Sequence, residues 1–179
     1  MLNLTKKVHF IGVGGIGTST IAKLMLKQNK IVSGSDLNSS EITQELKKLG
    51  INFFLGHRAE NLSNDTDLVI YSPAVPENNP ERQKAKKLGI PQFSYPEFLG
   101  QISKEKFTIA VSGTNGKSTT TSILGLILEA AGLDPLVIVG SKVQQWGSNL
   151  RLSNSCAGDK FVTSGRALWL RVVSGGRIC

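Results

Sequence analysis

The feature that most constrains the fold of this 179-residue chain is the pattern of residues 107–131. An apolar run at 107–111 turns at Ser112-Gly113 and leads through a polar loop into apolar residues at helical spacing. The pattern predicts a strand, a loop and a helix, in that order. We expect one face of this helix to hold Ile123, Leu124, Ile127 and Leu128. Backbone N–H groups of such a loop lie at the positive end of the helix and can surround a phosphate oxygen, and glycine lets the backbone come close.

The loop has the residues of a nucleotide-phosphate site at a shorter spacing than the standard phosphate loop. It reads G-x-x-G-K-S, because the residue five positions before Gly116 is Val111. We expect the Lys117 ammonium to reach towards the outer phosphates and the Ser118 hydroxyl to occupy one position on Mg2+. A plain helix N-terminus is the alternative; the strand before the loop and the helix after it favour the phosphate site.

A second glycine-rich turn follows the first apolar run of the chain, residues 7–11. Gly12, Gly14 and Gly17 fit the pattern G-x-G-x-x-G, and Asp36 stands 19 positions after Gly17. This spacing is close to that of a dinucleotide-binding fold, in which the acidic residue binds the ribose. The same glycines also occur where a strand and a helix pack tightly without a ligand, so both interpretations stay open.

Alternating strands and helices predict an α/β fold with a doubly wound, mostly parallel sheet over residues 1–103. Asn38 with Glu41 is the expected capping box of the second helix, and Asn79 is the expected cap of a helix that begins at Pro80. His57 follows the third strand, where it is either a surface hydrogen-bonding residue or part of a site. The expected strands are 7–11, 31–36, 51–55, 67–71 and 90–93, with a helix at 95–102 and a polar joint at 103–106.

Charge and cysteine content argue against two other kinds of function. The net charge is +8, and half of it lies in the last 29 residues, which hold five Lys or Arg against Asp159 alone. Aromatic residues do not alternate with basic ones, so we expect no nucleic-acid surface. Cys156 and Cys179 define neither a metal site nor a disulfide framework. Without a membrane-spanning run or a signal peptide, we expect a cytoplasmic protein with no membrane partner.

The ordered motifs GVGGIG, SD, GH, SPAVPENNPE and VSGTNGKSTTT resemble those of the Mur ligases of peptidoglycan synthesis, over about residues 7–155. The resemblance is closest to the branch that adds L-alanine. That branch usually has His in place of Asn115 and Thr in place of Ser118, and GTNGKS is more similar to the branches that add other amino acids. The residues alone therefore leave open which amino acid is added.

The resemblance implies a Rossmann-like domain, residues 1–103, that binds the UDP part of UDP-N-acetylmuramic acid. It also implies the start of a phosphate-loop ATPase domain, residues 104–155. Its chemistry is an ATP-dependent ligation in which a carboxylate attacks the γ-phosphate and the amine of L-alanine captures the acyl phosphate. Lys117 would be catalytic and Ser118 would bind Mg2+. The implied contacts are Gly14, Gly15, Gly17, Ser35, Asp36 and His57 for the sugar nucleotide, and Gly113, Thr114, Asn115, Gly116, Lys117, Ser118 and Thr119 for ATP.

This interpretation requires that both glycine corners leave their amides free for phosphate. It also meets a departure, because the family's later Glu, which binds a second Mg2+, has no counterpart after Glu129. We expect residues 156–179 to be a tail without resemblance, produced by a change of reading frame or a truncation near Ser155, and the chain alone to be inactive. A divergent terminal hairpin is the alternative for this tail.

Two further functions remain alternatives on the sequence. An NAD-dependent oxidoreductase built on the first glycine turn would leave the loop at Gly113–Ser118 unexplained. A non-catalytic nucleotide-binding module would use that loop alone, and it would bind ATP without responding to a UDP-sugar.

Overall fold

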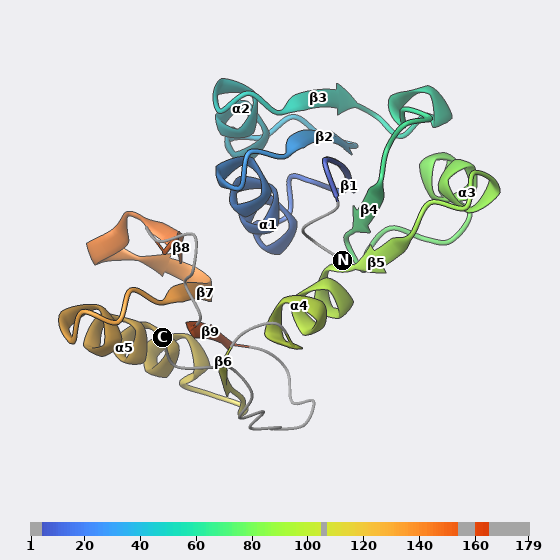
Figure 1. Cartoon of the computed structure of the whole chain (residues 1–179). Helices are drawn as coiled ribbons and strands as arrows, with labels where there is room; N and C mark the ends of the chain where they lie inside the picture. Colours follow the sequence, from blue (N-terminus) through green and yellow to red (C-terminus); the bar gives the residue numbers. More distant parts are fainter. Residues whose placement is uncertain (1–4, 105–106, 154–159, 165–179) are drawn as a thin grey trace. The chain divides into compact units, whose positions relative to one another are not determined.

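The computed structural model describes residues 5–104, 107–153 and 160–164, and for Lys160, Phe161 and Ser164 it describes the backbone alone. The chain divides into two compact units, the first ending at Phe98 and the second beginning at Leu99 (Figure 1). This division falls inside a helix, α4 (Tyr95–Lys104). The expected domain boundary lies at the end of the same helix, and it stays a prediction.

The first unit is a parallel five-stranded sheet with helices on both faces, as the sequence predicts (Figure 1). The strand order is β3-β2-β1-β4-β5, so the chain starts in the middle of the sheet and winds outwards in both directions. Helices α1 and α2 lie on one face and α3 on the other. The elements are β1 (Lys7–Ile11), α1 (Ile16–Lys27), β2 (Ile31–Asp36), α2 (Glu41–Lys48), β3 (Asn52–Leu55), η1 (Ala59–Asn61), β4 (Leu68–Tyr71), α3 (Pro80–Lys87) and β5 (Gln92–Ser94).

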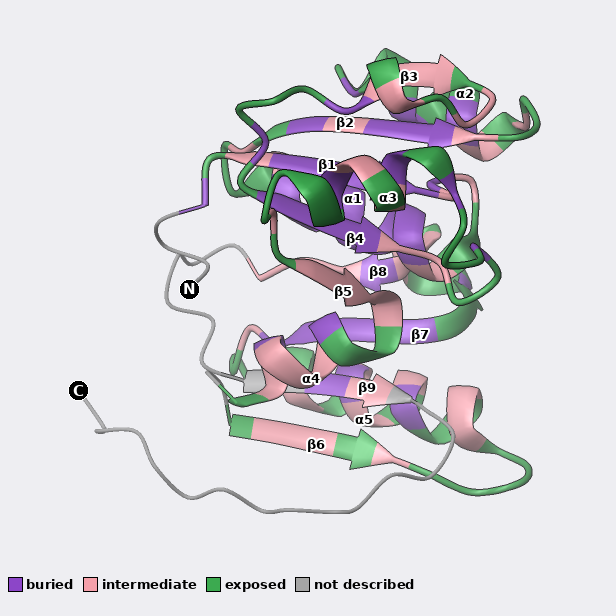
Figure 2. Cartoon of the chain, turned by 90° about the vertical axis from the view of Figure 1, so that its right-hand side faces the viewer, coloured by how far each residue is buried: buried purple, intermediate pink, exposed green. Residues whose placement is uncertain are grey.

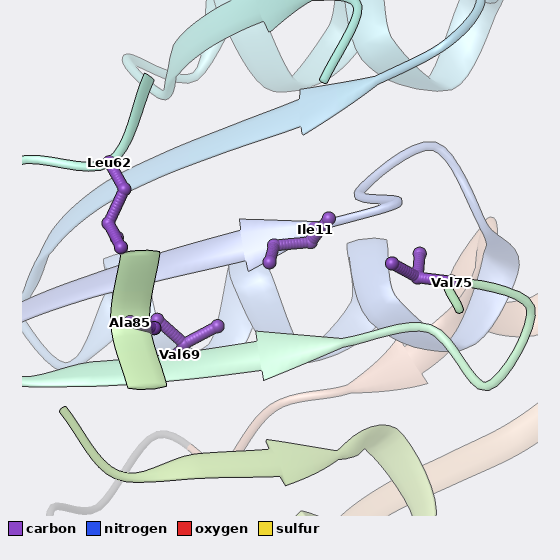
Figure 3. Close-up of a cluster of buried hydrophobic side chains, with 5 residues drawn as sticks. All are labelled: Ile11, Leu62, Val69, Val75 and Ala85. Atoms are coloured by element: carbon purple, nitrogen blue, oxygen red, sulfur yellow. The ribbon is translucent and has the colours of Figure 1, made fainter. Parts of the chain in front are cut away.

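The core of this unit follows from the position of each strand in the sheet. Strands β1, β2 and β4 are covered on both faces. β1 and β4 are buried along most of their length and β2 along half of it, whereas β3 at the edge has no buried residue (Figure 2). Continuous apolar runs are typical of such doubly covered parallel strands. On the α3 face, Ile11, Leu62, Val69, Val75 and Ala85 form one cluster of buried side chains (Figure 3).

The helix caps confirm one prediction and correct another. The Asn79 side chain accepts hydrogen bonds from the amides of Glu81 and Arg82, with Pro80 in the first turn, as predicted. The capping box of α2 was expected at Asn38 and Glu41, which is wrong. Ser40 is the cap, and its side chain and that of Thr43 bond each other's backbone amides. A threonine hydroxyl fills the role expected of a glutamate, because it reaches the cap amide over the same three-residue spacing.

The second unit is a four-stranded sheet in the order β6-β9-β7-β8, with one helix packed on it. Its elements are β6 (Phe107–Val111), α5 (Lys117–Ala130), β7 (Leu136–Val143), η2 (Gln144–Trp146), β8 (Ser148–Arg151) and β9 (Lys160–Ser164). β9 lies between β6 and β7 and runs parallel to both. Residues 160–164 of the expected tail thus form a strand, and buried Val162 joins the core, while the origin of the tail stays a prediction. The rest of the tail lies outside the described residues.

Helix α5 buries less of its apolar surface than its spacing predicts. Leu124 and Leu128 pack against the valines of β7 and β9. Ile123 and Ile127, which were expected on the same buried face, are 52% and 58% exposed. Among the described residues, no helix combines the length and the apolar character that a bilayer crossing requires.

Two isoleucines on strands of the first unit test this account of the core. Ile70 of β4 is fully buried, whereas Ile31 of β2 is 63% exposed. We expect Ile70→Ala to lower the free energy of unfolding by about 2–5 kcal/mol, because it leaves a cavity between packed layers. Ile31→Ala should change it by no more than about 0.5 kcal/mol. Urea unfolding followed by circular dichroism measures both, and equal losses would contradict the assigned core.

Candidate functional site

The strand order brings the predicted sugar-nucleotide residues to one edge of the first sheet. Strands β1, β2 and β3 are parallel neighbours, so the residues after them meet at their carboxyl ends, where α/β sheets bind ligands. The amide of Gly14 donates to Oδ2 of Asp36 over 2.8 Å. Oγ of Ser35 lies 2.9 Å from Nδ1 of His57. Ser35 is fully buried, so its side chain lies behind His57 and not at the surface.

The first glycine corner uses several of its own amides inside the protein. The amides of Gly12 and Val13 both donate to the carbonyl of Ser35, over 2.8 and 3.0 Å. The Asp36 carboxylate accepts from Gly14, as noted above. Gly12 also has φ +76°, a conformation that favours glycine. At these three amides the corner does not meet the requirement for a free phosphate cradle.

Side chains also lie close to the glycines of this corner. A β-carbon added at Gly17 would come within 2.7 Å of the Tyr95 ring, and one at Gly14 within 2.9 Å of Asp36. Gly15 is less crowded, because a β-carbon added there would lie 3.0 Å from the Thr18 hydroxyl oxygen. Burial raises the pKa of Tyr95, so its phenol is neutral. The structure thus gives Gly17 a packing reason, and its contact with a diphosphate stays a prediction.

The amides that this corner does offer belong to the first turn of α1. Within the described part of the chain, the backbone N–H groups of Ile16, Gly17 and Thr18 donate to no protein acceptor, and the first helical bond is from Ser19 to Gly15. No side chain caps this end of the helix. Unpaired amides at the positive end of a helix favour an anion. An anion bound here would face the amides of residues 16–18, about one turn further along the chain than the start of the glycine pattern at Gly12.

Behind this edge lies a buried carboxylate that the sequence analysis did not single out. Glu81 is fully buried in the first turn of α3. Its Oε2 accepts from His9 Nε2 at 3.0 Å and from Ser35 Oγ at 2.6 Å. Its Oε1 accepts from the Arg58 amide at 3.1 Å and from Asn61 Nδ2 at 2.7 Å. The two carboxylate oxygens therefore have four donors between them.

These donors keep Glu81 ionised in spite of its burial. Burial by itself raises the pKa of the Glu81 carboxyl, but the hydrogen bonds from His9, Ser35 and Asn61 outweigh it, and the pKa lies below its ordinary value. The helix N-terminus also favours a negative charge at this place. One buried carboxylate thus joins β1, β2, α3 and the segment after β3.

One sequence signal could have revealed this network. His9 stands in the middle of the apolar strand Lys7–Ile11, and a polar ring inside a core needs a hydrogen-bond partner. The partner could not be named from the sequence. Glu81 lies 72 positions away, in a helix whose many charged residues are typical of a solvent-exposed surface.

The second glycine corner, in the other unit, is open. Gly113 and Gly116 have φ +150° and +73°, and a β-carbon at Gly116 would have no heavy atom within 4 Å. Among the described residues, the amides of Lys117, Ser118 and Thr119 have no acceptor, and the first helical bond is from Thr120 to Gly116. Successive unpaired amides at a left-handed turn form an anion-binding concavity. As far as the described residues go, this corner leaves the amides of its helix start free, and the binding of phosphate there stays a prediction.

The two side chains with predicted chemistry stand at this corner. Nζ of Lys117 donates to the carbonyls of Gly113 and Thr114, over 2.6 and 2.9 Å, so the charge lies directly above the loop. Ser118 stands beside it in the first turn of α5, and its carbonyl accepts from Ser122. A hydroxyl oxygen at this place suits Mg2+, which binds through one or two protein oxygens together with phosphate. In the described ranges, no three His, Cys, Asp or Glu side chains are grouped to hold a metal.

Comparison with known proteins places this geometry in context. The profile described as "Mur ligase family, catalytic domain" matches residues 7–107. UDP-N-acetylmuramate--L-alanine ligase of Clostridium kluyveri is 48% identical over 151 residues, which are 84% of this chain and 33% of that protein. The ligase of the same name from a Sulfurihydrogenibium species is 46% identical over 147 residues, 82% of this chain and 32% of that protein. The chain therefore spans about a third of the length of these relatives.

Solved structures agree with the sequence comparison. A UDP-N-acetylmuramate-alanine ligase from Thermotoga maritima matches with a TM-score of 0.76 and 34% identity, over 88% of this chain and 37% of that one. A UDP-N-acetylmuramate:L-alanyl-gamma-D-glutamyl-meso-diaminopimelate ligase from Neisseria meningitides matches with a TM-score of 0.79 and 28% identity, over 89% of this chain and 52% of that one.

A double-mutant cycle tests the contact between Gly17 and Tyr95. The change Gly17→Ala should lower the free energy of unfolding by about 1–3 kcal/mol, because the new methyl group overlaps the ring. In a Tyr95→Ala background the same change should cost less, since the ring is gone. Gly100→Ala is the control, because a β-carbon added there would meet no atom within 4 Å outside its own stretch of helix. Equal costs of Gly17→Ala in both backgrounds would show that the contact does not matter.

The buried carboxylate predicts a specific dependence of stability on pH. Because the folded-state pKa of Glu81 lies below its ordinary 4.5, the ionised network stabilises the fold fully above that pH. The stabilisation is lost as the pH falls through the folded pKa. The difference in unfolding free energy between wild type and Glu81→Gln should be at least about 1 kcal/mol at neutral pH and should shrink below pH 4.5.

Denaturant titrations of both proteins at a series of pH values give this difference directly. Other carboxylates with lowered pKa, such as Asp67 and Glu97, titrate equally in both proteins and cancel. A difference that stays constant into acid would mean that Glu81 has the same pKa in the folded and the unfolded protein, and a difference that grows as the pH falls would mean that Glu81 is protonated in the folded protein.

Proposed function

This chain belongs to the Mur ligase family, and on that premise we propose that it forms the N-terminal part of an ATP-dependent ligase. The reaction that we propose joins L-alanine to UDP-N-acetylmuramic acid in peptidoglycan synthesis. The open glycine corner at Gly113–Ser118 is the observation that carries the proposal. Because the chain spans about a third of the relatives' length, the complete reaction requires parts that those relatives have and that this sequence does not cover.

The second unit supplies the phosphate-binding half of this chemistry. A carboxylate can attack a γ-phosphate only if the negative charge of both groups is reduced. The unpaired amides of Lys117, Ser118 and Thr119 are suited to accept phosphate oxygens, and the Lys117 ammonium adds a full positive charge. Contacts along the rest of the loop, Thr114 and Asn115 included, belong to the same proposal.

A metal ion is part of the proposed site. Mg2+ bound with the phosphates would supply Lewis-acid neutralisation of the charge that develops during transfer. Ser118 would hold it, since its side chain is a hydroxyl on the first turn of α5, beside the loop. Lys117 remains the residue that balances charge from the protein side.

The first unit is proposed to bind the UDP part of the sugar nucleotide. Its carboxyl edge offers the first-turn amides of α1 for a diphosphate and His57 for the nucleoside. Asp36 occupies the Gly14 amide, so a diphosphate either binds beside it at Ile16 and Gly17 or displaces it. The requirement that the whole corner be open is too strict, because the family profile covers these residues in a chain whose corner is partly closed.

The comparisons also bear on the amino acid and on the alternatives. The ligases from Clostridium kluyveri and the Sulfurihydrogenibium species have L-alanine in their names, which supports L-alanine although Asn115 and Ser118 differ from that branch. Because these relatives are ligases, the oxidoreductase alternative is not favoured. A cytoplasmic location, with small molecules as the partners, belongs to the same proposal. A nucleotide-binding module without ligase chemistry is an outcome of the experiment below.

Calorimetry of the full chain tests the proposal with three ligands: Mg-ATP, UDP-N-acetylmuramic acid and NADH. We expect the first two to bind and NADH not to bind. In Lys117→Gln the side-chain amide of the glutamine can still donate to the loop carbonyls, but the positive charge of the lysine is lost. This change should weaken Mg-ATP at least about tenfold and leave the UDP-sugar unaffected.

Lys48→Ala is the matched control, because it removes the same charge from an exposed position of α2 in the first unit. It should change neither affinity. Binding of Mg-ATP without any binding of the UDP-sugar would favour the non-catalytic module, and binding of NADH would favour the oxidoreductase.

A further inference from the structure

We propose that Glu81 is a positioning residue that fixes neutral His57 as the tautomer with its proton on Nδ1. Nε2 of His57 is then a hydrogen-bond acceptor at the carboxyl edge of the first sheet. We infer that it accepts an N–H or O–H group of the nucleoside in the bound nucleotide. The nature of the ligand rests on the proposed function; the tautomer rests on the hydrogen bonds alone.

The first step concerns the single proton of the Ser35 hydroxyl. An ionised carboxylate only accepts hydrogen bonds, so across the 2.6 Å contact Ser35 must be the donor to Glu81 Oε2. The Arg58 amide and Asn61 Nδ2 can only donate, and the pKa of the Glu81 carboxyl lies below its ordinary value, so no carboxyl proton competes at these contacts. The proton of Ser35 is therefore committed to Glu81.

The second step follows at His57. Its Nδ1 lies 2.9 Å from Ser35 Oγ, and Ser35 has no proton left to donate, so Nδ1 must carry the proton. The distance from Nδ1 to Glu81 Oε1 is 3.7 Å, too long for a hydrogen bond. Glu81 thus acts on His57 through Ser35 and not directly.

The third step is the exposure of the other ring nitrogen. In neutral His57 a proton on Nδ1 leaves a lone pair on Nε2. Nε2 is not among the buried unpaired polar atoms of the described residues, and 13% of the side chain is accessible, so this nitrogen reaches the surface. A lone pair repels a phosphate oxygen and accepts a hydrogen. The uracil imide N–H and the ribose hydroxyls are the donors of a uridine nucleotide.

The same carboxylate imposes the opposite tautomer on the other histidine. Nε2 of His9 faces Glu81 Oε2 at 3.0 Å and must carry a proton. Its Nδ1 lies 2.8 Å from Ser33 Oγ, whose hydroxyl donates to it when the ring is neutral. His9 is fully buried, so it has a structural role. The chain has two histidines in all, so the expected tautomer of each can be compared with that of the other in one spectrum.

Long-range proton–nitrogen NMR of the full chain with 15N-labelled histidine reads both tautomers. The spectrum is taken at an alkaline pH at which the histidine resonances have stopped moving. We expect one ring with its proton on Nδ1, assigned to His57, and one with its proton on Nε2, assigned to His9. His57 with its proton on Nε2 would overturn the inference.

Two variants test the role of Glu81. Glu81→Met removes the acceptor and frees the Ser35 proton for His57, so the Nδ1-protonated share of His57 should fall from nearly all to a minority. Ser35→Ala removes the hydroxyl that accepts the Nδ1 proton of His57 and should have the same effect on the tautomer. This variant decides the question if Glu81→Met does not fold. Ser33→Ala is the matched control, because it contacts His9 and should leave His57 unchanged. A His57 tautomer that both Glu81→Met and Ser35→Ala leave intact would refute the role of Glu81.

Calorimetry with UDP and three analogues identifies the donor. N3-methyl-UDP lacks the imide proton, and 2′-deoxy-UDP and 3′-deoxy-UDP each lack one hydroxyl. One of them should bind wild type about five- to tenfold more weakly than UDP, and in Ser35→Ala that difference should disappear. Equal binding of all four would overturn the acceptor role of Nε2. No binding of UDP at all would instead contradict the proposed function, whatever the NMR result.

Discussion

The first unit depends on one buried negative charge and on the donors that balance it. A carboxylate inside a protein is costly unless hydrogen bonds replace the water it has lost. Glu81 has four such bonds, and they come from β1, β2, η1 and the residue before η1. Because the partners come from β1, β2 and the segment after β3, satisfying this charge also fixes how those parts sit around the carboxyl edge of the sheet.

The two glycine corners of the chain show how similar sequence patterns acquire different local chemistry. Among the residues that the structure describes, the amides that follow Gly113–Gly116 have no acceptor, and the loop suits an anion. At Gly12–Gly14 the end of β2 lies close enough to take up the amides through the Ser35 carbonyl and the Asp36 carboxylate. At the first corner it is therefore the neighbouring strand β2, and not the glycines themselves, that decides which amides are occupied.

Much of the fold could be predicted from the chain because its signals are local. Apolar runs that predict strands alternate with segments of helical spacing. Asn79 and Pro80 predict the start of a helix, and the loop before Lys117 predicts a phosphate corner. Two features were misplaced for different reasons. The cap of α2 is local, but it uses Ser40 and Thr43 where an asparagine and a glutamate were expected. Residues 160–164 joined a sheet whose other strands are far back in the sequence, and no local pattern names those partners.

The sequence by itself determined the α/β class, the two glycine corners and the lysine and serine beside one of them, because these follow from residue type and short spacing. Only the tertiary structure decided which amides are free and which groups control His57. Those properties depend on distances between residues that are 22 to 72 positions apart, such as Ser35 with His57 and His9 with Glu81. Contacts of that kind form only when parallel strands are laid side by side, and a linear pattern carries no record of them.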